Sequence, residues 1–300
     1  MEIVAPQEWY SLLDNLQKEK GVAILLGATD TGKSTLAKFL ISHLSQRGEQ
    51  IALVDADIGQ SFLGPPTTIG LALFEFPPHW EEVFSSEIFF VGSTTPEGNF
   101  STHLKGVKRM VEKAISRGAE IIVVDTTGLV YGELGKELKR RKIDLLSPRF
   151  ILALQRTGEI EHILGLYKGN PSFGIHRLPV SEGVKSRSQE ERSLYRRKKF
   201  GEYFARARSR ELAVDGVELE GKVVDSGGFS IPLDCSIGVK GLLLGLKDVN
   251  DETLALGMIE GFIQEGGRLR ISTPLNEVEN VRILQLSSLK LTPSFEEERT

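Results

Sequence analysis

The sequence has little cysteine and no long hydrophobic run, and each shortage excludes a class of protein. Its 300 residues include one cysteine, Cys235, so neither an intrachain disulfide nor a thiolate metal cluster can form. We expect Cys235 to be a small buried or partly buried side chain. No apolar run approaches the about 20 residues that span a bilayer. The start, MEIVAPQEWY, lacks the basic and apolar regions of a signal peptide, so we expect a cytoplasmic protein without membrane contact.

An excess of charge of either sign is also missing. The net charge of −4 argues against a protein that coats nucleic acid with its whole surface, although a local basic groove remains compatible with it. The hydrophobic content of 40% and the charged content of 26% are typical of a globular protein with a sizeable core.

Apolar segments of strand length alternate with amphipathic helical segments over the first two thirds of the chain. The expected strands are 22–27, 51–55, 87–92, 120–125 and 149–154, and the expected helices are 7–19, 33–46 and 101–117. This alternation predicts an α/β fold, in which helices cover both faces of a parallel sheet.

The sequence pattern changes near residue 210. Short apolar segments rich in glycine follow, and they predict a small antiparallel β domain. We therefore expect a first domain at 1–210, including a lid and basic helix at 185–210, and a β-rich domain at 211–300. The acidic tail SFEEERT is expected to fray.

Residues 27–34 spell G-x-x-x-x-G-K-[ST] between a predicted strand and a predicted helix, which is the pattern of a P-loop NTPase. Glycines let backbone amides turn toward phosphates, and the helix N-terminus adds partial positive charge. Lys33 is expected to reach the β- and γ-phosphates, and the Ser34 hydroxyl to ligate Mg²⁺. The predicted ATP-binding residues are Gly27, Ala28, Thr29, Asp30, Thr31, Gly32, Lys33, Ser34 and Thr35.

Three aspartates lie at the ends of predicted strands: Asp55, Asp57 and Asp125. Ligands of open parallel sheets bind at the carboxyl ends of the strands, so these carboxylates lie at the expected edge. Capping of a turn is the alternative role for each. We predict that Ser34, Asp57 and Asp125 serve a Mg²⁺ ion. The five histidines show no metal-ligand spacing, so Mg²⁺ is the only metal predicted.

The chain resembles the polynucleotide 5′-hydroxyl kinases, a family with eukaryotic mRNA cleavage-factor, pre-rRNA-processing and archaeal members. The segments that carry the resemblance are GATDTGKST, DADIGQ (55–60), FFVGSTTPEGN (89–99), VVDTTGLVYG (123–132) and KSRSQEERSLYRRKKFGEYF (185–204). The VVDTTGLVYG segment looks more like the archaeal branch. The resemblance spans roughly 20–205, and the following β segment is compatible with the family's small C-terminal domain.

The resemblance implies transfer of the γ-phosphoryl group of ATP to the 5′-hydroxyl of an RNA or DNA end. Asp57 matches the position proposed to take the proton of the attacking hydroxyl. Gln60 is expected to orient that site or to contact the substrate. Phosphoryl transfer needs an in-line acceptor oxygen, a carboxylate beside it and cations that offset the developing charge, so the residues fit the chemistry.

The segment 185–210 carries ten Lys or Arg and three Glu, a net charge of +7. A solvated helix face is the ordinary explanation of such a run. However, Phe200, Tyr203, Phe204 and Ala207 form a stripe that predicts a buried face. The resemblance places the preceding segment in a lid over the nucleotide, with Arg187, Arg192 and Arg196 as candidates to contact the transferred phosphate.

The predicted nucleic-acid contacts follow strand ends and offer hydroxyls or amides: Gln60, Ser93, Thr94, Thr95, Asn99, Thr126 and Thr127. An ordinary turn before a helix is the alternative for 93–99. Trp80, Phe74 and Phe76 are candidates for base stacking, although core packing is the more common role of such residues.

Three other functions compete with the kinase. A GTPase or assembly ATPase shares the phosphate loop, but the nearest match to a guanine-reading segment, Leu246-Lys247-Asp248, does not fit. A catalytically silent ATP- and RNA-binding scaffold of RNA processing is the second alternative. A kinase of a small metabolite is the third, and it has no obvious need for a +7 segment. The sequence does not distinguish RNA from DNA as the acceptor, and it identifies no protein partner.

Overall fold

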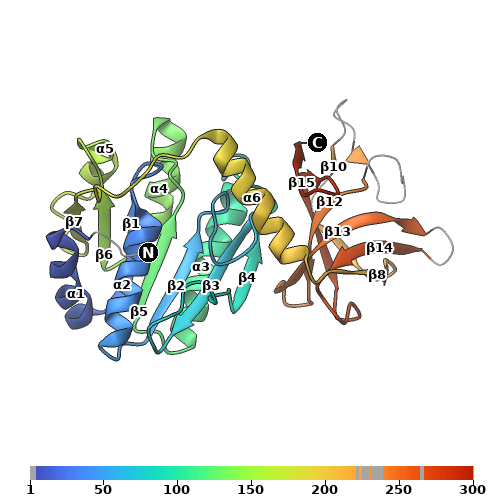
Figure 1. Ribbon diagram of the computed structural model, residues 1–300, viewed down its shortest axis with the longest axis horizontal. Coiled ribbons are helices and arrows are strands. Elements are labelled where there is room, and N and C mark those ends of the chain that lie inside the picture. Colours follow the sequence, from blue (N-terminus) through green and yellow to red (C-terminus); the bar gives the residue numbers. More distant parts are fainter. Residues whose placement is uncertain (1–4, 221–222, 225–229, 232–238, 264–266, 300) are drawn as a thin grey trace.

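The computed structural model describes residues 5–220, 223–224, 230–231, 239–263 and 267–299 (Figure 1). Cys235 lies outside the described residues. A layered α/β part comprises the first two thirds of the chain, a β-rich part comprises the last third, and the helix α6 (Gln189–Phe204) lies between them (Figure 1).

Five strands of the α/β part are parallel, in the order β2-β5-β1-β6-β7. Their bounds are β1 (Gly21–Leu26), β2 (Ile51–Ala56), β5 (Ile121–Thr126), β6 (Phe150–Leu154) and β7 (Gly174–Leu178). The first four are buried along nearly their whole length, as their continuous apolar sequences predict.

At one edge the predicted parallel sheet continues into antiparallel strands. Beyond β2 lie β3 (Thr68–Phe74) and β4 (Glu87–Phe90), each antiparallel to its neighbour. The physical reason is the connection between them: loops without a crossover helix join β2 to β3 and β3 to β4, and a parallel pair needs such a crossover.

Helices cover both faces of the sheet, as predicted. On one face, α1 (Gln7–Glu19) and α2 (Lys33–Gln46) bury Trp9 and Leu40 in one core cluster. On the other, α3 (Phe100–Ser116) and α4 (Gly132–Leu146) contribute Met110 and Ile143 to another. The short helices α5 (Glu161–Leu164) and η1 (Gly165–Tyr167) follow β6.

The β-rich part is mainly antiparallel and has a core cluster of its own, which includes Leu246 and Ile259. Its strands are β8 (Arg208–Ala213), β9 (Glu218–Glu220), β10 (Val223–Val224), β11 (Ser230–Ile231), β12 (Leu242–Lys247), β13 (Thr253–Ile263), β14 (Arg268–Thr273), β15 (Ile283–Leu291) and β16 (Glu297–Arg299). It continues the first sheet through one pairing, Thr253 with Ile88. The division into domains at residue 210 stays a prediction.

The helix α6 packs against both parts through the predicted apolar stripe. Phe200 and Phe204 are buried in a cluster that also contains Phe90 of β4 and Leu243 of β12. The prediction of a frayed tail is wrong, because Glu297–Arg299 pairs with β15 and Phe295 stacks on Phe204 with ring centroids 5.9 Å apart. The tail's glutamates also pair with arginines of α6, so charge complementarity offsets the cost of ordering it.

Candidate active site

The phosphate loop connects β1 to α2 and folds back on itself. Asp30 and Gly32 have left-handed φ values of 55° and 85°, which aspartate tolerates and glycine adopts freely. The Thr31 hydroxyl donates to the Ala28 carbonyl oxygen at 2.9 Å. A Cβ added at Gly27 would lie 2.7 Å from the Leu154 carbonyl oxygen of β6, so only glycine fits there. The loop therefore has the tight turn and helix N-terminus of a phosphate-binding site.

Lys33 is held within this loop. Its side chain is buried, with the residue 7% exposed, and its Nζ donates to the Ala28 carbonyl oxygen at 2.8 Å. Burial lowers the pKa of Lys33, and the nearby Asp125 and Asp57 carboxylates act in the opposite direction. An anion that reaches the loop would therefore gain a cation already in place.

Ser34 and Asp125 form a pair suited to a divalent cation. The Ser34 hydroxyl donates to Asp125 Oδ2 at 2.5 Å, and Asp125 Oδ1 is buried with no hydrogen-bond partner in the part of the chain that the structure describes. Such an orphaned oxygen fits a water of a Mg²⁺ shell, and hard oxygens are the ligands Mg²⁺ prefers. Among the described residues no three His, Cys, Asp or Glu could hold a metal together, so phosphates and water would supply most ligands.

The two aspartates after β2 have different surroundings. Asp55 is fully buried, and its Oδ2 accepts from the Ser61 hydroxyl at 2.9 Å and from the backbone amides of Phe62 and Leu63 at 2.8 and 3.1 Å. Asp57 is only partly buried, and its Oδ1 accepts from the amides of Gly59 and Gln60 at 3.2 and 3.1 Å. Asp55 thus orders the loop, whereas Asp57 keeps a carboxylate oxygen available to a substrate.

The candidate lid arginines lie in different places. Arg192 Nη2 pairs with Asp30 Oδ2 of the phosphate loop at 2.6 Å, and the backbone amide of Arg187 donates to the same oxygen at 3.0 Å. Arg196 instead pairs through Nε with Glu297 of β16. A Cβ at Gly32 would lie 2.9 Å from Val184 Cγ2, so the segment before α6 lies directly over the loop.

The loops that carry the predicted nucleic-acid contacts meet at this edge. A Cβ at Gly59 would lie 2.7 Å from the Thr94 carbonyl oxygen, which places the 93–99 loop against the one that holds Asp57. Gln60 Nε2 donates to the Arg192 carbonyl oxygen at 3.3 Å. Ser93 Oγ accepts from the amide of Thr95 at 3.1 Å. The loops after β1, β2 and β4 are therefore neighbours.

The loop after β5 completes the group. Thr126 is fully buried, and its hydroxyl donates to the Leu25 carbonyl oxygen at 2.7 Å. Thr127 follows it with slight exposure. Asn99 precedes α3 without a side-chain capping bond, and its Nδ2 is 3.4 Å from the Glu97 carbonyl oxygen.

Arg156 and Tyr195, which no sequence pattern indicated, also contact these loops. Arg156 Nη2 donates to the Asp30 carbonyl oxygen at 2.5 Å, and Tyr195 donates its hydroxyl proton to the Ser61 carbonyl oxygen at 3.0 Å. Arg156 comes two residues after β6, so its place at a strand end is the signal that would have found it. Tyr195 stands three residues after Arg192 on α6, next to it on the helix surface.

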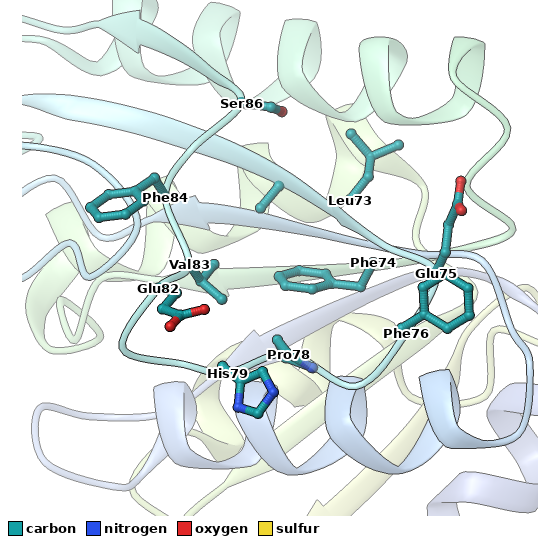
Figure 2. A pocket seen from close by; sticks show the side chains of 11 residues that line it. Leu73, Phe74, Glu75, Phe76, Pro78, His79, Glu82, Val83, Phe84 and Ser86 are labelled. Carbon is teal, nitrogen blue, oxygen red and sulfur yellow. The ribbon is translucent and has the colours of Figure 1, made fainter.

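Two of the candidate stacking aromatics, Phe74 and Phe76, line a pocket away from these loops, whereas Trp80 packs on Phe62, whose amide binds Asp55. Phe74 is buried, and Phe76 is 76% exposed on a pocket that Phe84 and His79 also line (Figure 2). Phe74 pairs with Ile51, which lies four residues before Asp55 in β2. At the usual rise of a strand, Phe74 is therefore about 13 Å from the strand end that carries Asp55. Trp80 packs on Phe74 and Phe62, with centroids 5.7 and 6.1 Å away. Phe74 therefore has the core role that was the alternative.

Binding of Mg²⁺-nucleotide is expected to weaken as the pH falls. Burial raises the pKa of Asp125 above its ordinary value, and the Asp55 carboxylate adds to the rise. The proton and the cation compete for this carboxylate, so acid favours the protonated form and disfavours Mg²⁺. Titration of Mg²⁺-ADP between pH 7.5 and 5.5 should show the dissociation constant rise by up to about tenfold per pH unit. Asp125→Asn should flatten that dependence, and an equally steep one in the variant would contradict the assignment.

Comparison with known proteins identifies a matching family model and similar proteins. The family model described as the mRNA cleavage and polyadenylation factor CLP1 P-loop matches residues 27–206. A polyribonucleotide 5′-hydroxyl-kinase of Thermococcus kodakarensis is 31% identical, over 97% of this chain and 95% of that protein. One of Pyrococcus horikoshii is 28% identical, over 97% and 92%.

A solved structure has a similar fold. A chain of the Clp1p–Pcf11p complex superimposes with a TM-score of 0.72 and 16% identity, covering 94% of this chain and 78% of that one. Among the described residues, no helix is both long and apolar enough to cross a membrane. The family model matches more than half of this chain, and the relatives match it over nearly its whole length. This chain therefore belongs to the CLP1 P-loop family.

Proposed function

We propose that the chain is an ATP-dependent polynucleotide 5′-hydroxyl kinase, which transfers the γ-phosphoryl group of ATP to the 5′-hydroxyl of RNA or DNA. The observation that carries the proposal is the meeting of Lys33, Ser34, Asp57, Asp125 and Arg192 at one sheet edge. The curated relatives are named polyribonucleotide 5′-hydroxyl-kinases, which supports this acceptor.

Each residue has a role in the proposed step. Residues 27–35 hold the phosphates, and Lys33 and Arg192 offset negative charge on the γ-phosphoryl group. Ser34, Asp125 and Asp57 serve Mg²⁺, which neutralises phosphate charge when it is bound. The acceptor oxygen forms a bond to the γ-phosphorus while the bond from that phosphorus to the β,γ-bridging oxygen breaks. The hydroxyl proton passes to Asp57, and ADP leaves.

The acceptor is proposed to lie along the loops after β2, β4 and β5. Gln60, Ser93, Thr94, Thr95, Asn99 and Thr127 offer polar groups there, and Arg187 and Arg196 extend the positive charge of the lid. The Thr126 hydroxyl donates to the Leu25 carbonyl oxygen inside the protein. We therefore propose that Thr126 helps to hold Thr127 in position. The cytoplasmic location stays a prediction.

The test is label transfer. The protein is incubated with γ-labelled ATP, Mg²⁺ and matched RNA and DNA oligonucleotides that carry either a 5′-hydroxyl or a 5′-phosphate. We expect label on the 5′-hydroxyl ends alone, and removal of Mg²⁺ should stop the reaction. Bound ATP with no label on any end would favour the scaffold instead, and hydrolysis without transfer would favour an assembly NTPase.

Asp57→Asn is expected to lower kcat on the order of 10²-fold with little change in the affinity for ATP. Asparagine keeps an Oδ1 that accepts from Gly59 and Gln60, so the loop stays ordered, but the amide takes no proton. Steady-state kinetics with a saturating acceptor measure the loss, and an unchanged melting temperature excludes misfolding. A rate within threefold of the original would show that another group accepts the proton.

A further inference from the structure

Two lysines of α4, Lys139 and Lys142, have no exposed surface. They are three residues apart and so share one face of the helix, on the side of the sheet that α3 and α4 cover. Lysine is almost never fully buried without a partner. Neither forms an ion pair with a carboxylate among residues 5–220, 239–263 and 267–299, and hydrogen bonds hold both.

Their partners differ. Lys142 Nζ lies 2.9 Å from Nε2 of His103 on α3, which joins the two helices. Lys139 Nζ donates to the Thr127 carbonyl oxygen at 2.5 Å and to Thr126 Oγ1 at 2.8 Å. Only Lys139 therefore reaches the loop that follows β5.

That loop lies against the phosphate loop. A Cβ at Gly128 would be 2.3 Å from Thr29 Oγ1 and 2.7 Å from the Thr29 amide nitrogen, so the two backbones are in direct contact. On its other side Thr126 is bonded to Leu25 of β1. Lys139 thus attaches residues 126–128 to α4, through the carbonyl of the residue proposed to meet the acceptor.

The amine of Lys139 acts here as a hydrogen-bond donor. Burial lowers its pKa well below the ordinary value, Lys142 and Lys33 act in the same direction, and Asp57 and Asp125 act in the opposite one. A methionine of similar length would fill the same space, yet it would leave the Thr127 carbonyl without its buried donor. The side chain therefore acts on the loop through its donor protons as well as its volume.

On the basis of the proposed function, we propose that Lys139 is a positioning residue of the transfer reaction: it fixes loop 126–128 so that Thr127 meets the 5′ end of the nucleic acid. Lys139 is too deeply buried to touch that substrate. Its loss should therefore act on the acceptor and on kcat while ATP still binds in the loop of residues 27–35.

The test compares Lys139→Met with Lys142→Met, which removes an equally buried amine from the same helix face. We expect Lys139→Met to raise the KM for the 5′-hydroxyl oligonucleotide or lower kcat by at least tenfold, with the KM for ATP within threefold. Lys142→Met should change each constant less than threefold. Lys139→Gln, which retains a donor, should restore part of the loss and covers the case in which the methionine variant does not fold.

Each outcome bears on a separate claim. Equal losses in the two methionine variants, or a glutamine variant no better than methionine at equal melting temperature, would overturn the positioning role. A selective rise in the KM for ATP would do the same. Failure of the unaltered protein to label any 5′-hydroxyl end would instead overturn the proposed function.

Discussion

Lys33→Ala is expected to lower phosphoryl transfer on the order of 10³-fold, because it removes the cation held inside the phosphate loop. The buried Lys33 ammonium lies among Asp125, Asp57 and Asp30, so its loss leaves three carboxylates facing a polyphosphate with less positive charge between them. The hydrogen bond to Ala28 is also lost, which loosens the loop itself. The affinity for ATP should therefore fall together with kcat.

Lys38→Ala is a matched control for this result. Lys38 lies five residues later on the same helix and contacts the rings of Phe62 and Trp80, at 4.7 and 5.3 Å from their centroids. Its removal should leave the affinity for ATP within threefold of the original. Calorimetric titration with ATP and initial-rate measurements compare the two variants. A Lys33→Ala enzyme that retains a tenth or more of the rate would contradict the role given to the loop.

The α/β part could be predicted because its signals are local. Continuous apolar runs gave β1, β2, β5 and β6 within a residue or two, and the amphipathic pattern predicted α1 with its observed ends, Gln7 and Glu19. The strand β3, TIGLALF, was missed although it is equally apolar. Its antiparallel pairing with β2 depends on contacts between distant residues, and no local pattern reports these.

The candidate site was predictable where a motif defines it and not where folding brings it together. The phosphate loop and the strand-end aspartates are visible in the sequence. By contrast, only the family resemblance separates Asp57 from Asp55, because the physical difference is the set of bonds that Asp55 accepts from Ser61, Phe62 and Leu63. Lys139 was missed for a related reason. A lysine in a helical segment is expected to be exposed to solvent, and only the three-dimensional structure shows that this one is buried.

Arg192→Ala is the second large effect, an expected loss of at least about 10³-fold in kcat. Among the three candidates, Arg192 has its guanidinium at the phosphate loop, paired with Asp30 at 2.6 Å. Arg196 is bound to Glu297, and Arg187 lies over the ring of Tyr195 at 5.5 Å from its centroid. The charge that develops on the transferring group lies next to this loop, so Arg192 is the arginine that reaches it with the least rearrangement.

Arg197→Ala is the matched control for Arg192, since Arg197 lies on the same helix and pairs with Glu296 on the surface at 2.7 Å. Its removal should change kcat less than threefold, because an exposed ion pair contributes little. Arg196→Ala should give an intermediate loss, and Arg192→Lys should recover only part of the rate, because an ammonium lacks the planar fork that binds two phosphate oxygens. Single-turnover transfer to a 5′-hydroxyl oligonucleotide separates these variants. If Arg196→Ala is the more damaging, the pair with Glu297 must open during the reaction, and the lid must close further over the nucleotide than it does here.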